Sequence, residues 1–152
     1  MRLAFIVSRY NAFVTERLEA GGRARAREAG LVDGDLATFF VPGAFELPQA
    51  AERVAESGEW DAIVCLGCLI KGETPHFDFI AQSVADGITR AAQATGVPMA
   101  FGVLTTNTAD EAMARAGDGA SNKGREATDA ALSMAALYAS LDHAADRTVA
   151  RS

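Results

Sequence analysis

His76 is the residue of this sequence whose side chain best suits proton transfer. A free imidazole has a pKa of about 6.5, so it can give or take a proton near neutral pH. His76 follows the segment Lys71-Gly72-Glu73-Thr74-Pro75, and a helix is expected to begin near Phe77. The glycine lets backbone approach a ligand, and the amides of Glu73 and Thr74 can face an anion. Without this context, a lone histidine at the start of a helix would be interpreted as a capping or surface residue. The position of His76 in the loop that joins a predicted strand to a predicted helix, called a joint below, favours a catalytic role.

A second stretch with distinctive chemistry is Val41-Pro42-Gly43-Ala44-Phe45-Glu46. Pro42 and Gly43 predict a sharp turn, after which a helix begins at about Ala44. The first N–H groups of that helix lack helical partners and can donate to a polar ligand. Glu46 can accept hydrogen bonds from ligand hydroxyls, or it can merely complement the helix dipole, and both interpretations stay open.

Both stretches follow short apolar runs, of which the sequence has four: Leu3 to Ser8, Leu36 to Val41, Ala62 to Leu69 and Val97 to Thr105. None shows strict polar alternation, and continuous apolar runs of this length are typical of strands covered on both faces, as in a parallel sheet. The segments between them predict helices, and hence βαβ units with right-handed crossovers. The expected fold class is α/β: a three-layer αβα sandwich with a four-stranded parallel sheet, doubly wound and flavodoxin-like.

Apolar residues recur at helical spacing in three stretches: Leu47, Ala50, Ala51, Val54 and Ala55; Phe77, Ile80, Ala81, Val84 and Ile88; and Ala130, Met134, Leu137 and Leu141. Such stripes are typical of helices that pack on a core. The first helix, about 13–29, has Val14 and Leu18 as its anchors and ends at Gly30. A shorter helix is expected over about 110–116.

Ligands of open α/β sheets bind outside the carboxyl ends of the strands. Most residues with distinctive chemistry lie at those ends, in the joints Ser8-Arg9-Tyr10-Asn11, Val41 to Glu46, Lys71 to His76 and Thr105 to Thr108. The functional site is therefore expected at this edge of the sheet.

The composition indicates one globular domain over residues 1–152, with a polar, frayed tail from Asp142 to Ser152. The formal net charge of −6 argues against a nucleic-acid partner, which would need a basic face. The first apolar run is too short to span a membrane and no cleavage site follows it. No membrane partner and a cytoplasmic location are therefore expected.

Two further clusters have ordinary explanations. The first helix carries Arg17, Arg23, Arg25 and Arg27, which we interpret as a solvated face paired with Glu16, Glu19 and Glu28, with a partner-subunit contact as the alternative. Cys65 and Cys68 have C-x-x-C spacing, but two cysteines alone cannot build a structural zinc site, only two histidines exist to help, and the pair lies inside the apolar run from Ala62 to Cys68. On a strand, positions three apart point to opposite faces. We expect two free thiols in or beside a core strand, as suits a reducing compartment.

The sequence argues against three common functions of α/β domains: nucleotide binding by a P-loop, dinucleotide binding and phosphorylation as a receiver. The glycine-rich segment from Gly117 to Gly124 is not a phosphate-binding P-loop, because Lys123 precedes Gly124. No G-x-G-x-x-G follows the first strand, which argues against a Rossmann dinucleotide site. A phosphorylation receiver domain has this size and layout, but it needs acidic residues where this chain has Ser8-Arg9-Tyr10.

From about Leu3 to Leu141 the chain resembles the lumazine synthase family. The motifs that carry the resemblance are Arg9-Tyr10-Asn11, Val41-Pro42-Gly43-Ala44-Phe45-Glu46-Leu47-Pro48, the run from Gly67 to Asp78, the run from Phe101 to Asn107, and Arg115-Ala116-Gly117 followed by Asn122-Lys123-Gly124. Each motif is short, but together, in this order and at family-like spacing, they are specific.

The resemblance implies a transferase of riboflavin biosynthesis that condenses 5-amino-6-(D-ribitylamino)uracil with 3,4-dihydroxy-2-butanone 4-phosphate. The products would be 6,7-dimethyl-8-ribityllumazine, phosphate and water, with no metal or organic cofactor. It implies His76 as the catalytic residue and substrate contacts from Tyr10, Asn11, Ala44, Phe45, Glu46, Cys68, Leu69, Ile70, Glu73, Thr74, Phe101, Arg115 and Lys123. Tyr10 replaces the usual phenylalanine or tryptophan, so its ring can stack on the pyrimidine but its hydroxyl needs a partner.

The resemblance also implies a homo-oligomer, because Phe101, Arg115 and Lys123 act on the neighbouring subunit's site in this family. The family forms pentamers, and some members stack into decamers or sixty-subunit shells. Family members usually carry an arm before the first strand that pairs with the neighbour's sheet, whereas Met1 here almost abuts that strand. We expect a pentamer and leave larger assemblies open. Two alternatives are a non-catalytic flavin or lumazine binder, which would need neither His76 nor Arg115, and a mainly structural cage.

Overall fold

The computed structural model describes residues 1–151, with side chains as far as Val149. In chain order its elements are β1 (Leu3–Ser8), α1 (Ala12–Glu28), η1 (Asp33–Asp35), β2 (Leu36–Val41), η2 (Ala44–Glu46), α2 (Leu47–Glu56), β3 (Ala62–Ile70), α3 (His76–Thr95), β4 (Met99–Thr106), α4 (Ala109–Ala114) and α5 (Lys123–Arg151), where η marks a short 3-10 helix. The strands agree with the prediction except near their ends. β4 begins at Met99 rather than Val97, because Pro98 has no N–H to donate to a sheet.

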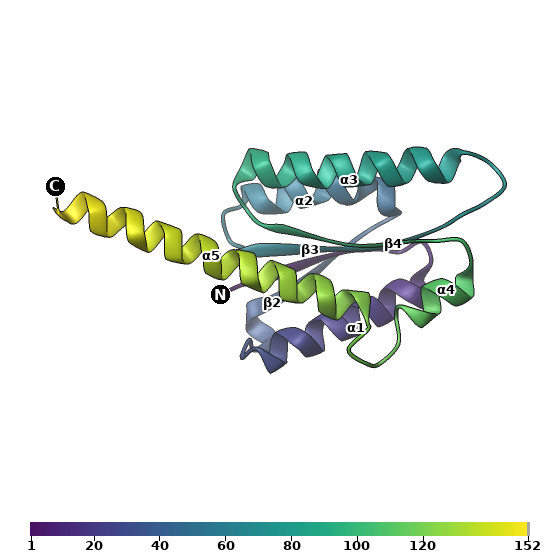
Figure 1. Ribbon diagram of the computed structural model, residues 1–152, viewed down its shortest axis with the longest axis horizontal. Coiled ribbons are helices and arrows are strands. Elements are labelled where there is room, and N and C mark those ends of the chain that lie inside the picture. The colour runs from purple at the N-terminus through teal and green to yellow at the C-terminus, as the bar shows by residue number, and fades with distance from the viewer. Residues whose placement is uncertain (152) are drawn as a thin grey trace.

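The four strands form one parallel sheet in the order β2-β1-β3-β4. The register aligns Ser8 with Val41 and Ile70 with Thr106, so the carboxyl ends of the strands meet along one edge. Helices α2 and α3 cover one face of the sheet, and α1, α4 and α5 cover the other (Figure 1). This arrangement confirms the predicted three-layer αβα sandwich with flavodoxin-like topology.

Each face of the sheet is buried in its own apolar cluster. Side chains alternate along a strand, so Phe5 packs in the cluster beside α1 and α5 while its neighbour Ile6 packs beside α2 and α3. Val14 and Leu18 of α1 are fully buried, as predicted. Burial on both faces explains why the strands appear in the sequence as continuous apolar runs.

Helix α5 packs on the sheet through a different face from the predicted stripe. The stripe side chains Met134, Leu137 and Leu141 are 41%, 47% and 55% exposed. The buried face consists of small residues instead: Ala127, Ala131 and Ala135. A Cβ atom added to Gly102 of β4 would lie 3.1 Å from the Cβ of Ala127. The helix therefore approaches the strand too closely for large side chains, which the period of the sequence alone does not reveal.

The C-terminal segment was expected to be frayed, but α5 continues to Arg151 and projects beyond the sheet (Figure 1). Side chains from Ala136 to Val149 are exposed. This segment is rich in alanine and has no glycine or proline to end the helix. Ser152, the last residue of the predicted tail, lies outside the described residues. Neither α5 nor any other helix between residues 1 and 151 combines the length and apolarity needed to cross a membrane.

On the charged face of α1, Arg23, Arg25 and Arg27 form ion pairs, partly with residues of other elements, whereas no ion pair is seen for Arg17 or Glu16 among the described residues. The ion pairs are Arg23–Glu19, Arg25–Asp129, Arg27–Asp33 and Arg125–Glu28. The first was predicted. The second and fourth join α1 to α5, and the hydrogen bond from Arg125 lowers the pKa of the Glu28 carboxyl. The face thus fixes one helix against another within the chain.

Candidate active site

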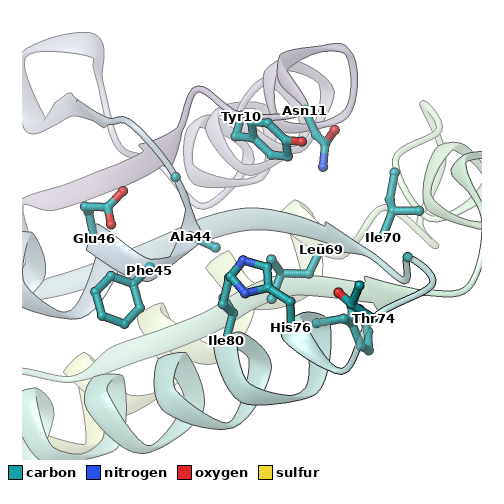
Figure 2. A pocket seen from close by; sticks show the side chains of 13 residues that line it. Tyr10, Asn11, Ala44, Phe45, Glu46, Leu69, Ile70, Thr74, His76 and Ile80 are labelled. Atoms are coloured by element: carbon teal, nitrogen blue, oxygen red, sulfur yellow. The ribbon is translucent and has the colours of Figure 1, made fainter.

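A cavity of about 360 Å³ opens at the carboxyl edge of the sheet. It is lined by Tyr10, Asn11, Gly43, Ala44, Phe45, Glu46, Leu69, Ile70, Gly72, Thr74, His76, Phe77 and Ile80. Figure 2 shows these side chains around one space, with Tyr10 and Asn11 facing His76 and Ile80 across it. They come from the loops after β1 and β2, from the end of β3 with the loop after it, and from the start of α3, so the cavity lies at the edge of the sheet where the sequence predicts the site.

Tyr10 and Asn11 form one wall of the cavity. The N–H of Tyr10 donates to the carbonyl oxygen of Pro42 at 3.1 Å, which holds the joint after β1 against the joint after β2. Asn11 has a left-handed backbone with φ of 61°, and its Nδ2 atom donates to the carbonyl oxygen of Cys68 at 2.9 Å. The Tyr10 side chain is 69% exposed, so a flat ligand can stack on its ring.

The turn η2 forms the wall after β2. The N–H of Glu46 donates to the carbonyl oxygen of Gly43 at 3.2 Å and closes this turn, before α2 begins at Leu47. Ala44 is buried against the sheet, while the Phe45 side chain is 56% exposed. The half-buried Glu46 brings a carboxylate to the cavity, where it can accept hydrogen bonds from hydroxyl or N–H groups of a ligand.

His76 is the first residue of α3, one position earlier than the predicted start. Pro75 precedes it, and the Pro75 carbonyl accepts the N–H of Asp78 at 3.1 Å. Ile80 lies one helical turn after His76 on the same face, so both side chains reach the cavity (Figure 2). The exposed imidazole can therefore exchange protons with a bound substrate and with water.

Phe101, Arg115 and Lys123 lie together in a second cavity, of about 380 Å³. It borders the edge strand β4 and the loop between α4 and α5, and none of its described lining residues also lines the first cavity. The N–H of Lys123 donates to the carbonyl oxygen of Arg115 at 2.8 Å, so the two basic residues start from adjoining backbone. Such a pair of cations suits a phosphate group.

Two predicted site residues, Cys68 and Glu73, are not among the described residues that line the first or the second cavity. Cys68 is 1% exposed and packs beside α1 and α5, whereas Cys65 faces α2 and α3. This confirms two free thiols on opposite faces of a core strand. Burial raises the pKa of the Cys65 thiol to about 12 and that of Cys68 to about 11. Glu73 is exposed in the loop before α3.

Phe77 and Ile80 line the cavity although the sequence assigned them only to the apolar stripe of a helix. The spacing of four residues between His76 and Ile80 was the available signal, because it places both on one helical face. In the second cavity, Ser121 and Glu126 are lining residues that no sequence pattern marked. Their positions depend on how the loop after α4 folds back.

The first cavity combines aromatic and aliphatic side chains with a carboxylate, hydroxyl groups and an imidazole, around a space that fits a small molecule. Within the part of the chain that the structure describes, no group of three or more His, Cys, Asp and Glu side chains could hold a metal ion. The family model for 6,7-dimethyl-8-ribityllumazine synthase matches residues 1–139, which include every residue of both cavities. The chain therefore belongs to the 6,7-dimethyl-8-ribityllumazine synthase family, whose members are oligomeric transferases of riboflavin biosynthesis.

Proposed function

We propose that the two cavities are the two halves of one active site, which adjacent copies of the chain complete within a homopentamer. The reaction follows from the family: 5-amino-6-(D-ribitylamino)uracil and 3,4-dihydroxy-2-butanone 4-phosphate condense to 6,7-dimethyl-8-ribityllumazine, phosphate and water. The first cavity holds the uracil and the reacting carbons. Arg115 and Lys123 of the next copy hold the phosphate.

The uracil stacks on Tyr10, whose exposed ring forms one wall of the first cavity. Glu46 accepts hydrogen bonds from the ribityl hydroxyls, and Ala44 and Phe45 line the path of that chain. Leu69 and Ile70 border the ring at the end of β3. The main chain of Cys68 contributes by accepting a hydrogen bond from the Asn11 side chain, which it thereby holds at the cavity wall.

The phosphate of the four-carbon substrate lies near the start of α3. Thr74 offers a hydroxyl, and the amides of Glu73 and Thr74 precede the positive end of the helix dipole. Arg115 of the adjacent copy adds a planar, permanently charged fork that makes two contacts with a phosphate. Lys123 adds a second cation, and Phe101 of the same copy covers the apolar side.

His76 transfers protons in this scheme. The 5-amino group of the uracil attacks the ketone and forms an imine with loss of water. Removal of the C3 proton then expels phosphate from C4 and leaves an enol, which becomes a ketone. The ribitylamino nitrogen attacks this new ketone and closes the second ring with loss of a second water. Each stage moves a proton, and His76, whose side chain lines the cavity (Figure 2), carries it. Holding two substrates in contact supplies much of the rate enhancement.

The proposal rests on one observation: within one chain, His76 lines the first cavity and Arg115 lines the second. A site with an imidazole but no cation for the phosphate is incomplete, and a second copy supplies the missing part. A non-catalytic flavin or lumazine binder would need the aromatic and carboxylate walls alone. The presence of His76 and Arg115 favours the enzyme over such a binder. The free thiols agree with a cytoplasmic enzyme.

Co-expression of two single variants tests the shared site. His76→Ala and Arg115→Ala, each expressed alone, should form lumazine slowly when both substrates are supplied. In mixed oligomers, a site with both native halves arises by chance at about one interface in four, so activity should recover to about a quarter of the native value. A mixture no more active than its parents would show that each chain carries a complete site. Sedimentation of the native protein tests the pentamer.

A further inference from the structure

The side chain of Asn122 is 2% exposed and lies just before α5, in the loop that carries the basic residues of the second cavity. Its amide makes four hydrogen bonds. Nδ2 donates to the carbonyl oxygens of Arg17 at 3.2 Å and Gly117 at 2.9 Å. Oδ1 accepts from the N–H groups of Gly124 at 2.8 Å and Arg125 at 3.2 Å. Both protons and both lone pairs of the amide are thus used.

These bonds divide into two functions. The two that Oδ1 accepts cap the first turn of α5, and a serine, threonine or aspartate oxygen could do the same. The two that Nδ2 donates have no part in capping. One closes the loop on itself at Gly117, and the other fastens the loop to the backbone of α1 at Arg17. Only a side-chain amide supplies this pair of donors together with the capping oxygen.

The loop fastened in this way joins Arg115 to Lys123. The N–H of Lys123 donates to the Arg115 carbonyl at 2.8 Å, and the N–H of Asn122 donates to the Gly119 carbonyl at 3.1 Å. The backbone positions of the two cations are therefore fixed relative to each other by bonds within the loop. Their position relative to the rest of the chain is fixed through the Asn122 bond to Arg17.

Two glycines make room for this arrangement. A Cβ atom on Gly21 of α1 would overlap the Oδ1, Cγ and Nδ2 atoms of Asn122, and one on Gly124 would overlap the carbonyl of Leu18. The α1 helix and the start of α5 thus meet at backbone contact around the buried amide. The Asn122 side chain therefore cannot shift without moving the loop.

We propose that Asn122 is a positioning residue for phosphate binding: its two amide donors hold the loop that carries Arg115 and Lys123 against α1, in the place from which both cations reach the phosphate of the four-carbon substrate. The inference rests on the proposed function, because it takes Arg115 to be a phosphate ligand. Asn122 itself touches neither substrate and acts through the backbone of the loop.

Asn122→Ser provides the test, because the hydroxyl keeps a capping oxygen but lacks the paired amide donors. The KM for the butanone phosphate should rise about tenfold, since displacement of a binding group by about 1 Å is enough for such losses. The KM for the uracil should stay within about twofold. Inhibition by inorganic phosphate should weaken in parallel with the first KM. The matched control is Gly119→Ala in the same loop, where an added Cβ meets nothing within 4 Å.

Gly21→Ala is a second route to the same result from another element. Alanine is favoured over glycine inside a helix, so any loss must come from displacement of Asn122. It should raise the KM for the butanone phosphate as Asn122→Ser does. If both variants lower the urea midpoint and leave that KM unchanged, Asn122 is only a helix cap and the inference is wrong. If Arg115→Ala also leaves that KM unchanged, the phosphate assignment itself fails, which is a separate result.

Discussion

The Nδ2 atom of Asn11 lies 2.9 Å from the carbonyl oxygen of Cys68 and donates a hydrogen bond to it. Asn11 stands at the start of α1 and Cys68 near the end of β3, so this bond ties the wall formed by Tyr10 and Asn11 to the strand beside the first cavity. Asn11 also has a left-handed backbone, with φ of 61°. Asparagine tolerates that conformation better than other residues with a Cβ atom. Two variants separate the bond from the backbone conformation.

Asn11→Gly should lose only the hydrogen bond, a cost of about 1 kcal/mol in the free energy of unfolding. Asn11→Ala should lose the bond and also force alanine into the left-handed region, for a total of about 2 kcal/mol. Urea denaturation of both variants measures the difference. Equal losses for alanine and glycine would mean that the backbone conformation is not strained. Both variants should also weaken uracil binding, because the Tyr10 wall is no longer fixed to β3.

His76→Ala should lower kcat by about a hundredfold and leave both KM values nearly unchanged, because the imidazole moves protons and positioning remains. Stopped-flow absorbance of lumazine formation measures the rate. His143→Ala is the matched control, since that histidine is exposed on the projecting part of α5. Unchanged turnover in His76→Ala would remove the residue from the mechanism, and complete loss would give it a larger role than proton transfer.

The two buried thiols predict a loss of stability at alkaline pH. Burial raises the pKa of Cys65 from 9.0 to about 12 and that of Cys68 from 9.0 to about 11. Above pH 9.0 the unfolded chain releases these protons while the folded chain keeps them, so the free energy of unfolding falls as the pH rises. The slope contributed by each thiol approaches about 1.4 kcal/mol per pH unit between its unfolded and folded pKa values.

Urea denaturation between pH 8 and pH 11 checks this slope against a Cys65→Ala, Cys68→Ala variant, which should show a shallower one. The absolute stabilities differ because alanine leaves a small cavity, so only the slopes are compared. Iodoacetamide should modify both thiols quickly in urea and slowly in the folded protein, because the thiolate is the reactive form. Parallel slopes in the two proteins would contradict the burial of the thiols.

Gly102→Ala should destabilise the fold by about 1–3 kcal/mol through overpacking. An added Cβ would lie 2.5 Å from Cδ2 of Leu66 and 2.9 Å from the Cys65 carbonyl oxygen, and the backbone carbonyl cannot move aside cheaply. Thermal unfolding compares this variant with Gly34→Ala, where the added Cβ meets nothing within 4 Å. A Gly102→Ala protein as stable as its control would mean that the Leu66 side chain and the Cys65 backbone of β3 can shift at little cost.

Much of the fold follows from local patterns in the sequence. The strands appear as continuous apolar runs, and the bounds of β1 and β2 agree with the prediction. The face of α5 does not follow from its period, because both a stripe of large apolar residues and a stripe of alanines run along the helix. The contact with Gly102 selects the alanines, and that contact depends on a residue of another element.

The candidate site also has a part that the sequence predicts and a part that it does not. By itself the sequence determined a parallel α/β sheet and placed His76, Glu46 and Tyr10 at its carboxyl edge, because parallel strands bring their ends together in any order. The resemblance implied that Arg115 and Lys123 act on a neighbouring site, but only the tertiary structure shows the cavity, apart from that of His76, in which they lie. Their place depends on β4 being an edge strand and on the loop that Asn122 fastens to α1. Residue types reveal which groups can do chemistry, whereas strand order and long-range hydrogen bonds determine which of them share one space.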